Sequence, residues 1–196
     1  MNNSHINFFS AQTFTDHPIS WLILLGLILI LIAMTLIIKK EGQKIDYEHE
    51  VFEIGNFQIK VPLWWTQKEG PNKQSLSFYR SDTAYEWLAT YYWYPKKDIE
   101  NSSEEFFRNF ILNEKLELDE SEAIIDELHS KSKEHYKVFR IEGTATQAKI
   151  KRCYVDCFII EDEKNNEVLI GYSWSSILNG LVEGPYFERV LETLLD

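Results

Sequence analysis

Residues that could carry out catalysis or hold a metal are scattered through this sequence without the spacing that such chemistry requires. The five histidines form no His-Glu-x-x-His motif and no two-histidine, one-carboxylate group, which are common metal-binding arrangements. The eight glycines occur singly, so there is no glycine-rich phosphate loop, and no Gly-x-Ser-x-Gly nucleophile motif is present. The sequence therefore predicts no catalytic residue, no metal site and no cofactor, and we expect a protein that is not an enzyme.

The two cysteines, Cys153 and Cys157, lie in a stretch whose pattern predicts a β-strand. Residues four apart on a strand have Cα atoms about 13 Å apart, whereas a disulfide needs roughly 4.4–6.8 Å. Neither thiol has a Cys or His companion at metal-ligand spacing, and an alternating apolar strand lacks the basic, accessible setting of a nucleophilic cysteine. We predict two unpaired thiols that serve as small buried hydrophobic residues.

Aromatic residues form the densest unusual feature of the sequence, in the pair Trp64-Trp65 and in the run from Trp87 to Tyr94. Successive side chains of a strand point to opposite faces, and both faces of this run are largely apolar, which is typical of a central strand covered on both sides. Tyr and Trp are also the residues that protein interfaces concentrate. Because Pro95 ends the strand, its last residues should emerge. The predicted partner-binding residues are Trp93, Tyr94, Trp64 and Trp65.

An apolar run from Ile19 to Ile38 contains 20 residues and no charge. As a helix it would be about 30 Å long, which is the thickness of the hydrocarbon core of a bilayer. Trp21 falls at one membrane interface, and Lys39 and Lys40 fall at the other. A cleaved signal peptide is disfavoured because the run is too long, no basic region precedes it and no small-residue cleavage site follows it. The run predicts a single transmembrane anchor.

Charge is distributed unevenly along the chain and bears on its partners. The chain has 20 Lys and Arg and 31 Asp and Glu, of which 18 basic and 30 acidic residues follow position 40. A net charge of −12 in this part disfavours nucleic-acid binding, because it repels phosphate backbones. Lys39, Lys40 and Lys44 follow the apolar run while no Lys or Arg precedes it, so the positive-inside rule places the soluble domain in the cytoplasm rather than outside.

Hydrophobic periodicity and turn residues predict an α+β domain behind the anchor. Gly55-Asn56 predicts a two-residue hairpin turn between strands over 51–54 and 57–62. Ser102 and Glu105 form a capping box that begins one helix, and Pro185 suits the first turn of a second helix at the C-terminus. Further strands are predicted over Ser75–Arg80, Glu86–Tyr94, Glu122–His129, His135–Thr146, Ile150–Glu161 and Val168–Ser175.

Short connections between these strands indicate a largely antiparallel sheet flanked by two main helices and preceded by a single transmembrane helix. The first helix has Phe106, Phe107, Phe110 and Ile111 on one face, and the second has Phe187, Val190, Leu191 and Leu194. The predicted organisation is a polar tail (1–18), a transmembrane helix (19–38), a charged linker (39–50) and the α+β domain (51–196).

Three stretches of the domain resemble PsbP/Mog-type α/β/α sandwich domains, which include the bacterial DcrB-like proteins. IGNFQIKVPLWW resembles their opening strand followed by Pro-x-x-Trp, and HYKVFRIEGTA resembles a strand that carries an Arg and then a Gly, here Arg140 and Gly143. The Tyr-bearing strand at Tyr172 and the final helix of form FxxVLxxL are similar as well. The resemblance covers about residues 51–195 and implies an antiparallel sheet with flanking helices and a non-catalytic module that binds or assembles other proteins.

Two functions of different classes follow. The first is a membrane-anchored, non-catalytic interaction or assembly domain that acts on a protein complex at the same membrane. The alternative is a carrier or sensor of a small apolar ligand or lipid held between sheet and helix. An apolar pocket of about 300 Å³ or more would favour the carrier, and a filled core with an exposed aromatic patch would favour the interaction domain. The predicted partners are the bilayer, through 19–38, and a protein.

Overall fold

The computed structural model describes residues 18–42, 48–80, 86–99, 101–119, 126–128 and 133–196. Most of the predicted polar tail, part of the predicted linker and both ends of the strand predicted over Glu122–His129 lie outside the described residues. The chain divides into two compact units, Met1–Gln43 and Lys44–Asp196, and each is described by itself.

The first unit contains one helix, α1, which spans Pro18–Gly42. From Trp21 to Ile37, every side chain position except Gly26 is exposed, and the large apolar residues among them expose between 41% and 68% of their surface. The structure describes the side chains of α1 from residue 21 to residue 37. Within the described residues, no helix is long and apolar enough to cross a membrane. Trp21 is 56% exposed, while the side chains of Lys39 and Lys40 lie outside the described residues.

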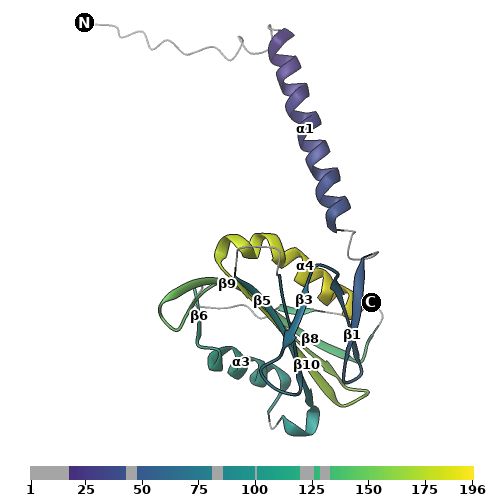
Figure 1. Cartoon of the computed structure of the whole chain (residues 1–196), viewed down its shortest axis with the longest axis vertical. Helices are drawn as coiled ribbons and strands as arrows, with labels where there is room; N and C mark the ends of the chain where they lie inside the picture. The colour runs from purple at the N-terminus through teal and green to yellow at the C-terminus, as the bar shows by residue number, and fades with distance from the viewer. Residues whose placement is uncertain (1–17, 43–47, 81–85, 100, 120–125, 129–132) are drawn as a thin grey trace, which may run out of the picture. The chain divides into compact units, whose positions relative to one another are not determined.

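The second unit is an α+β domain with a large antiparallel sheet (Figure 1). Eight strands form this sheet in the order β3-β4-β5-β10-β9-β8-β6, with β7 also paired to β8, and β1 and β2 form a separate hairpin. The elements are β1 His49–Ile54, β2 Phe57–Pro62, β3 Thr66–Glu69, β4 Ser75–Tyr79, β5 Trp87–Pro95, η2 Lys96–Asp98, α3 Ser103–Asn113, β6 Leu116–Leu118, β7 Asp126–Leu128, β8 Tyr136–Gln147, β9 Lys151–Asp162, β10 Glu167–Ser175 and α4 Ile177–Leu195.

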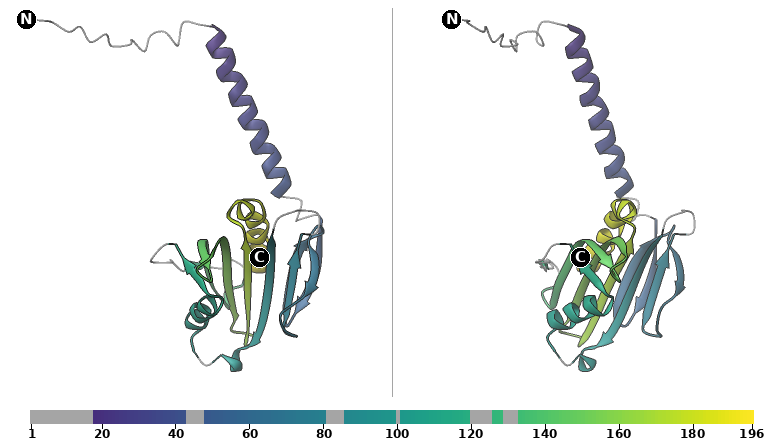
Figure 2. Two further views of the ribbon diagram at one scale, coloured as in Figure 1. Left: turned by 60° about the vertical axis from the view of Figure 1, so that its left-hand side comes forward. Right: turned by 90° about the vertical axis from the view of Figure 1, so that its left-hand side faces the viewer.

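The two faces of the sheet carry separate hydrophobic cores because side chains alternate along each strand. On one face, Tyr91, Phe158 and Leu169 pack with Phe187 of α4, so we call it the α4 face. On the opposite face, which we call the α3 face, residues such as Ile170 pack with α3. Figure 2 shows the long strands of the sheet with the teal helix α3 and the yellow helix α4 beside them. The fold is therefore layered, with β1–β2 and α4 on one face and α3 on the other.

The strand β5 confirms the prediction of a central strand buried on both sides. It lies between β4 and β10 in antiparallel register. Trp87, Ala89 and Tyr91 belong to the core of the α4 face, and Tyr92 belongs to the core of the α3 face. Each large aromatic side chain buried in this way contributes about 1.5–3 kcal/mol to stability.

The predicted turn at Gly55-Asn56 is confirmed, and it connects the hairpin to the sheet. Gly55 has a φ of +59°, and a Cβ there would lie 2.0 Å from the indole nitrogen of Trp93, so only glycine fits. The Asn56 amide N–H donates to Glu167 Oε2 at 2.9 Å, and the Asn56 side chain donates to Glu167 Oε1 at 2.8 Å. Residues 111 positions apart thereby fasten the hairpin turn to the start of β10.

The predicted N-cap of α3 at Ser102 is confirmed, and the predicted start of the last helix is wrong. Ser102 Oγ accepts a hydrogen bond from the Glu105 N–H at 3.2 Å, and α3 begins at the next residue. The helix α4 begins at Ile177, with Ser176 as its N-cap, so Pro185 lies inside it rather than in its first turn. The predicted buried face is confirmed, because Phe187, Val190, Leu191 and Leu194 are all at most 3% exposed.

Both cysteines are free and buried on β9, as the strand geometry predicted. Burial raises the pKa of the Cys157 thiol well above its ordinary value, and burial also raises the pKa of the Cys153 thiol. Neither thiol is therefore activated as a thiolate nucleophile at neutral pH.

Candidate functional site

The structure places Trp93 and Tyr94 on opposite faces of the sheet, so the two residues do not form one surface. Trp93 is partly buried, lies against the hairpin turn at Gly55 and packs on the α4-face core. Tyr94 contacts Phe106 of α3 edge-on, with ring centroids 5.3 Å apart. Each residue thus fastens a covering element to the sheet and keeps only part of its side chain exposed.

The other predicted pair, Trp64 and Trp65, contacts α4. Trp64 meets Tyr186 edge-on at 5.2 Å. Trp65 is only 5% exposed, lies 4.5 Å from the ring of Trp87 and donates its indole N–H to Glu183 Oε2 at 3.3 Å. Since Trp87 and Trp93 are six residues apart on one strand, about 20 Å, the predicted aromatic residues do not converge. Trp65 in particular is a core residue with almost no surface to offer a partner.

A different group of residues forms the strongest candidate site. A pocket of about 670 Å³, which we call the groove, lies where β3, β4, β5, β9 and β10 meet at one end of the sheet. Its lining residues share this end of the sheet and come from five separate segments: Gln67, Lys68, Tyr79, Arg80, Glu86, Trp87, Leu88, Lys151 and Trp174.

The floor of the groove is an apolar row on the α3 face. Tyr79 pairs with Leu88 across β4 and β5, and Leu88 pairs with Trp174 across β5 and β10. All three side chains are partly exposed. The core residue Tyr172, two positions before Trp174, contacts Phe110 of α3 with ring centroids 6.0 Å apart. The helix therefore reaches the middle of this face, and the row at the strand ends remains open to solvent.

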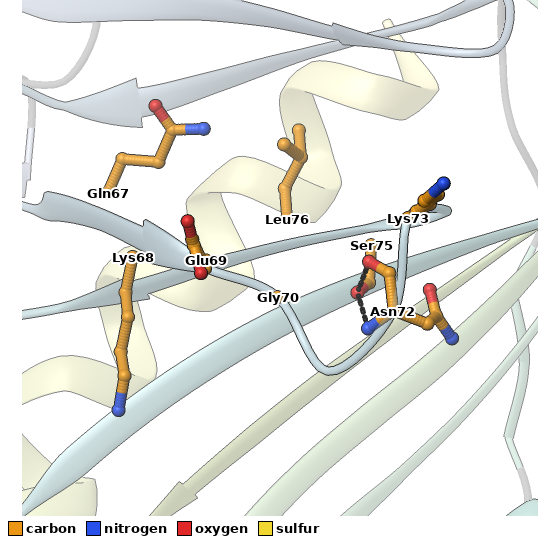
Figure 3. Close-up of a pocket in the computed structure, with 8 residues that line it drawn as sticks. All are labelled: Gln67, Lys68, Glu69, Gly70, Asn72, Lys73, Ser75 and Leu76. Carbon is orange, nitrogen blue, oxygen red and sulfur yellow. Dashed lines mark hydrogen bonds between the residues drawn. The ribbon is translucent and has the colours of Figure 1, made fainter.

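Basic side chains lie at this end of the sheet, beside the floor and toward α4. Lys151 lies over the Trp174 ring at 4.5 Å and forms an ion pair with Glu86. Arg80 donates from Nη1 to Glu183 Oε1 at 2.6 Å, and Glu183, on α4, is fully buried. Figure 3 shows Lys68 and Gln67 pointing to opposite sides of β3, as the alternation of a strand requires. The groove thus combines an aromatic floor with cations, of which Arg80 is held in place by a buried carboxylate.

A second pocket adjoins the first at the turn between β3 and β4 (Figure 3). It measures about 780 Å³ and shares Gln67 and Lys68 with the groove. Ser75 Oγ accepts from the Asn72 N–H at 3.1 Å and donates to the Asn72 carbonyl oxygen at 2.8 Å, so these groups satisfy one another. The pocket offers no aromatic residue, and we regard it as an extension of the groove along β3.

A buried cluster of charged side chains lies on the α4 face, away from the groove. Arg140 donates from Nε to Asp156 Oδ1 at 3.0 Å and from Nη2 to Asp156 Oδ2 at 2.8 Å, and it also pairs with Glu188 of α4 and with Glu142. Burial raises the pKa of Asp156 to about 6, although the hydrogen bonds from Arg140 oppose this shift. Burial alone would lower the pKa of Arg140, but Asp156 and the two glutamates raise it above its ordinary value. The side chains pair with one another beneath α4, which indicates a structural role.

Metal coordination receives no support from the part of the chain that is described, in which no group of three or more His, Cys, Asp or Glu is placed to hold an ion. His5, His17 and His129 lie outside that part.

The residues of the groove were missed by the sequence analysis. Lys68, Tyr79, Leu88, Lys151 and Trp174 come from positions spread over 107 residues and meet only through strand register. The one available signal was that each lies within two residues of a strand end, where side chains leave the covered part of a sheet.

No protein-family model and no curated protein matches the sequence. Similar solved structures include PA94 from Pseudomonas aeruginosa, a protein of unknown function, with 9% identity and a TM-score of 0.46 over 75% of this chain and 96% of that chain. A mutant of the protein Mog1 has 10% identity and a TM-score of 0.45 over 76% of this chain and 91% of that chain. With TM-scores below 0.5, neither match carries an argument about the family or the function of this chain.

Proposed function

We propose that this chain is a membrane-anchored, non-catalytic interaction domain that binds a protein at the same membrane. One observation carries the proposal: α1 exposes large apolar side chains along the whole of its described length. Contiguous apolar surface of this extent is costly in water and typical of a membrane or protein contact. The uncharged run continues in the sequence to Ile19 and Ile38, which makes it long enough to span a hydrocarbon core.

Binding of a protein is favoured over carriage of a small apolar ligand by the character of the pockets. A carrier needs a largely enclosed, apolar cavity. The groove instead opens to solvent and has charged residues on its rim, and the space between sheet and α4 is filled by stacked rings such as Tyr91 on Phe187 at 5.9 Å. The sequence resemblance to PsbP/Mog-type domains points in the same direction. We therefore do not retain the carrier.

Membrane anchoring predicts how the chain partitions on extraction. The full-length chain should stay in the membrane pellet after washes with high salt and with alkaline carbonate, because apolar burial does not depend on charge pairing. A chain that begins at Glu41 should move to the supernatant. Immunoblotting of both fractions measures this outcome, and a full-length chain released by the alkaline wash would contradict the anchor.

Orientation is the next part of the proposal, and it rests on the basic residues after the apolar run. Lys39, Lys40 and Lys44 follow the run, so the domain should face the cytoplasm. A reporter that is active only in the cytoplasm should therefore be active when fused after Asp196. The paired control is a reporter that requires export, fused at the same position, and its activity would place the domain outside.

A further inference from the structure

We propose that the groove binds an extended acidic peptide segment of the partner protein, laid across the strands from β3 to β9. Carboxylates of the peptide would pair with Lys68 and Lys151, and an apolar side chain between them would rest on Leu88 and Trp174. This inference depends on the proposed interaction function and gives it a site and a partner chemistry.

Charge complementarity is the first support. Of the nine lining residues, three are basic and one is acidic, although the chain after position 40 has 18 basic and 30 acidic residues. When Glu183, the partner of Arg80, is counted with them, basic groups still outnumber acidic ones at the groove by three to two, unlike in the rest of the chain after position 40. A surface of this kind attracts acidic segments and repels basic ones, which sets both orientation and specificity.

The state of the cations is the second support. Lys68 forms no ion pair or hydrogen bond with the side chains of the described residues, so its ammonium group is available. Lys151 pairs with Glu86, whose side chain is 68% exposed, and an exposed pair of this kind is worth little and exchanges readily. Arg80 is committed to the buried Glu183, which neutralises its charge, so it is not counted among the cations available to a ligand. The groove therefore offers two cations at its ends, Lys68 and Lys151, for the carboxylates of a ligand.

Spacing is the third support. Lys68 lies on β3 and Lys151 on β9, and three strands separate them. Four strand spacings of about 4.8 Å give about 19 Å across the sheet. The row through Lys68 meets β9 at Cys157, so Lys151 also lies six residues, or about 20 Å, further along its strand. The direct separation of the two backbone positions is about 28 Å, which an extended peptide covers in roughly eight residues. Between these ends, the floor of Tyr79, Leu88 and Trp174 gives one apolar side chain a place to pack. The favoured ligand therefore has two acidic residues about eight positions apart with apolar residues between them. An anionic bilayer fits less well, because single side chains of a peptide can enter a pocket of about 670 Å³, whereas the surface of a bilayer stays outside it.

A binding measurement with defined peptides tests the proposal. The protein is the full-length chain in uncharged detergent micelles, and the probe is a fluorescein-labelled peptide, Glu-Ser-Val-Ser-Phe-Ser-Val-Ser-Glu, which places its two acidic residues eight positions apart and its apolar residues on the same side. Fluorescence anisotropy at low salt should show saturable binding that weakens as salt rises. The same peptide with Lys in place of both Glu should not bind. Equal binding of the two peptides would overturn the inference.

Substitutions locate the site. The double variant Lys68→Glu, Lys151→Glu should weaken binding of the acidic peptide by about tenfold or more, because both ion pairs are lost and the reversed charges repel the peptide. Trp174→Ala should also weaken it, through loss of the apolar floor. Lys164→Glu, on the exposed turn between β9 and β10, is the matched control and should leave affinity within about twofold. If either lysine reversal disturbs the circular dichroism spectrum, Lys68→Gln and Lys151→Gln replace it.

Three results would overturn the inference. The first is binding that the groove variants leave unchanged, and the second is equal weakening by Lys164→Glu, which reflects net charge alone. The third is displacement of the peptide by phosphatidylserine vesicles, with the groove variants losing vesicle binding, which assigns the groove to the membrane surface.

Affinity capture separates failure of the inference from failure of the proposed function. If the full-length chain and its groove variant capture a partner equally well, the interaction function is supported and only the assignment of the groove as its site is wrong. Absence of any partner in crosslinked captures from detergent-solubilised membranes removes the interaction function itself.

Discussion

Replacing Phe187 by alanine should lower the free energy of unfolding of the domain by about 3–5 kcal/mol. Phe187 is completely buried, stacks on Tyr91 with ring centroids 5.9 Å apart and lies 5.4 Å from Phe158. The ring is the point at which α4 is fastened to the two central strands. Truncation removes its transfer free energy and leaves a cavity that these neighbouring rings cannot close by small movements.

Urea denaturation followed by circular dichroism measures the effect. Val182→Ala is the control on the same helix, because Val182 is 43% exposed and its loss should cost less than about 0.5 kcal/mol. The midpoint should fall for Phe187→Ala while the slope against urea stays constant, since the surface exposed on unfolding hardly changes. Comparable losses for the two variants would show that α4 is not held by this ring.

Local sequence signals predicted the elements that local chemistry determines. The alternation of the run from Trp87 to Tyr94, the glycine turn at Gly55 and the Ser102 cap each depend on residues within a few positions. Their physical causes are side-chain alternation, a positive φ and a donor left open at a helix end. The large antiparallel sheet followed from these elements and from their short connections.

Errors arose where a local preference was outweighed by a wider context. Proline is favoured in the first turn of a helix, which made Pro185 a convincing start. The helix α4 in fact begins eight residues earlier, at Ile177, and Pro185 is tolerated on an exposed side of it. The strand β3 was missed because its four residues, Thr66 to Glu69, are all exposed and show no apolar alternation. The strand is defined by its pairing with β4, and the sequence alone does not reveal this pairing.

The candidate site was the least predictable part, because cross-strand register creates it. The aromatic residues proposed as a partner surface are contiguous in sequence, yet alternation sends Trp93 and Tyr94 to opposite faces. The groove has the reverse character, since Tyr79, Leu88 and Trp174 are distant in sequence and adjacent through register. Sequence proximity is thus a poor guide to a site that lies on a sheet face.

Arg140 supports the second prediction with a large effect. Arg140→Met should lower the free energy of unfolding at pH 8 by about 3–5 kcal/mol, because the carboxylate of Asp156 is fully buried and would lose both hydrogen bonds of its bidentate partner. Arg108→Met is the control, since Arg108 pairs with Glu104 on the exposed surface of α3 and should cost at most about 0.5 kcal/mol. Equal losses for the two variants would contradict a structural role for the buried pair.

The loss of stability caused by Arg140→Met should depend on pH, because Asp156 titrates at a different pH in the folded and unfolded states. Asp156 has a pKa of about 6 in the folded protein against 3.8 as its ordinary value, so the folded state binds the proton more tightly than the unfolded state. The contribution of Asp156 to stability is therefore fully present below about pH 4 and is lost as the pH rises through about 6. Without Arg140, the carboxylate loses the hydrogen bonds that lower its pKa, and it should stay protonated to a higher pH.

The destabilisation caused by Arg140→Met should consequently shrink between pH 8 and pH 5, because a protonated Asp156 no longer needs a cation. Urea unfolding of both proteins across this range measures the difference, and Asp156→Asn supplies the reference in which no carboxyl can titrate at this position. When Asp156→Asn is already present, the further cost of Arg140→Met should be nearly independent of pH. The contrary result is a destabilisation by Arg140→Met that stays constant with pH while Asp156 is present. It would show that burial does not raise the pKa of Asp156, and that Arg140 is not what keeps this carboxyl group ionised.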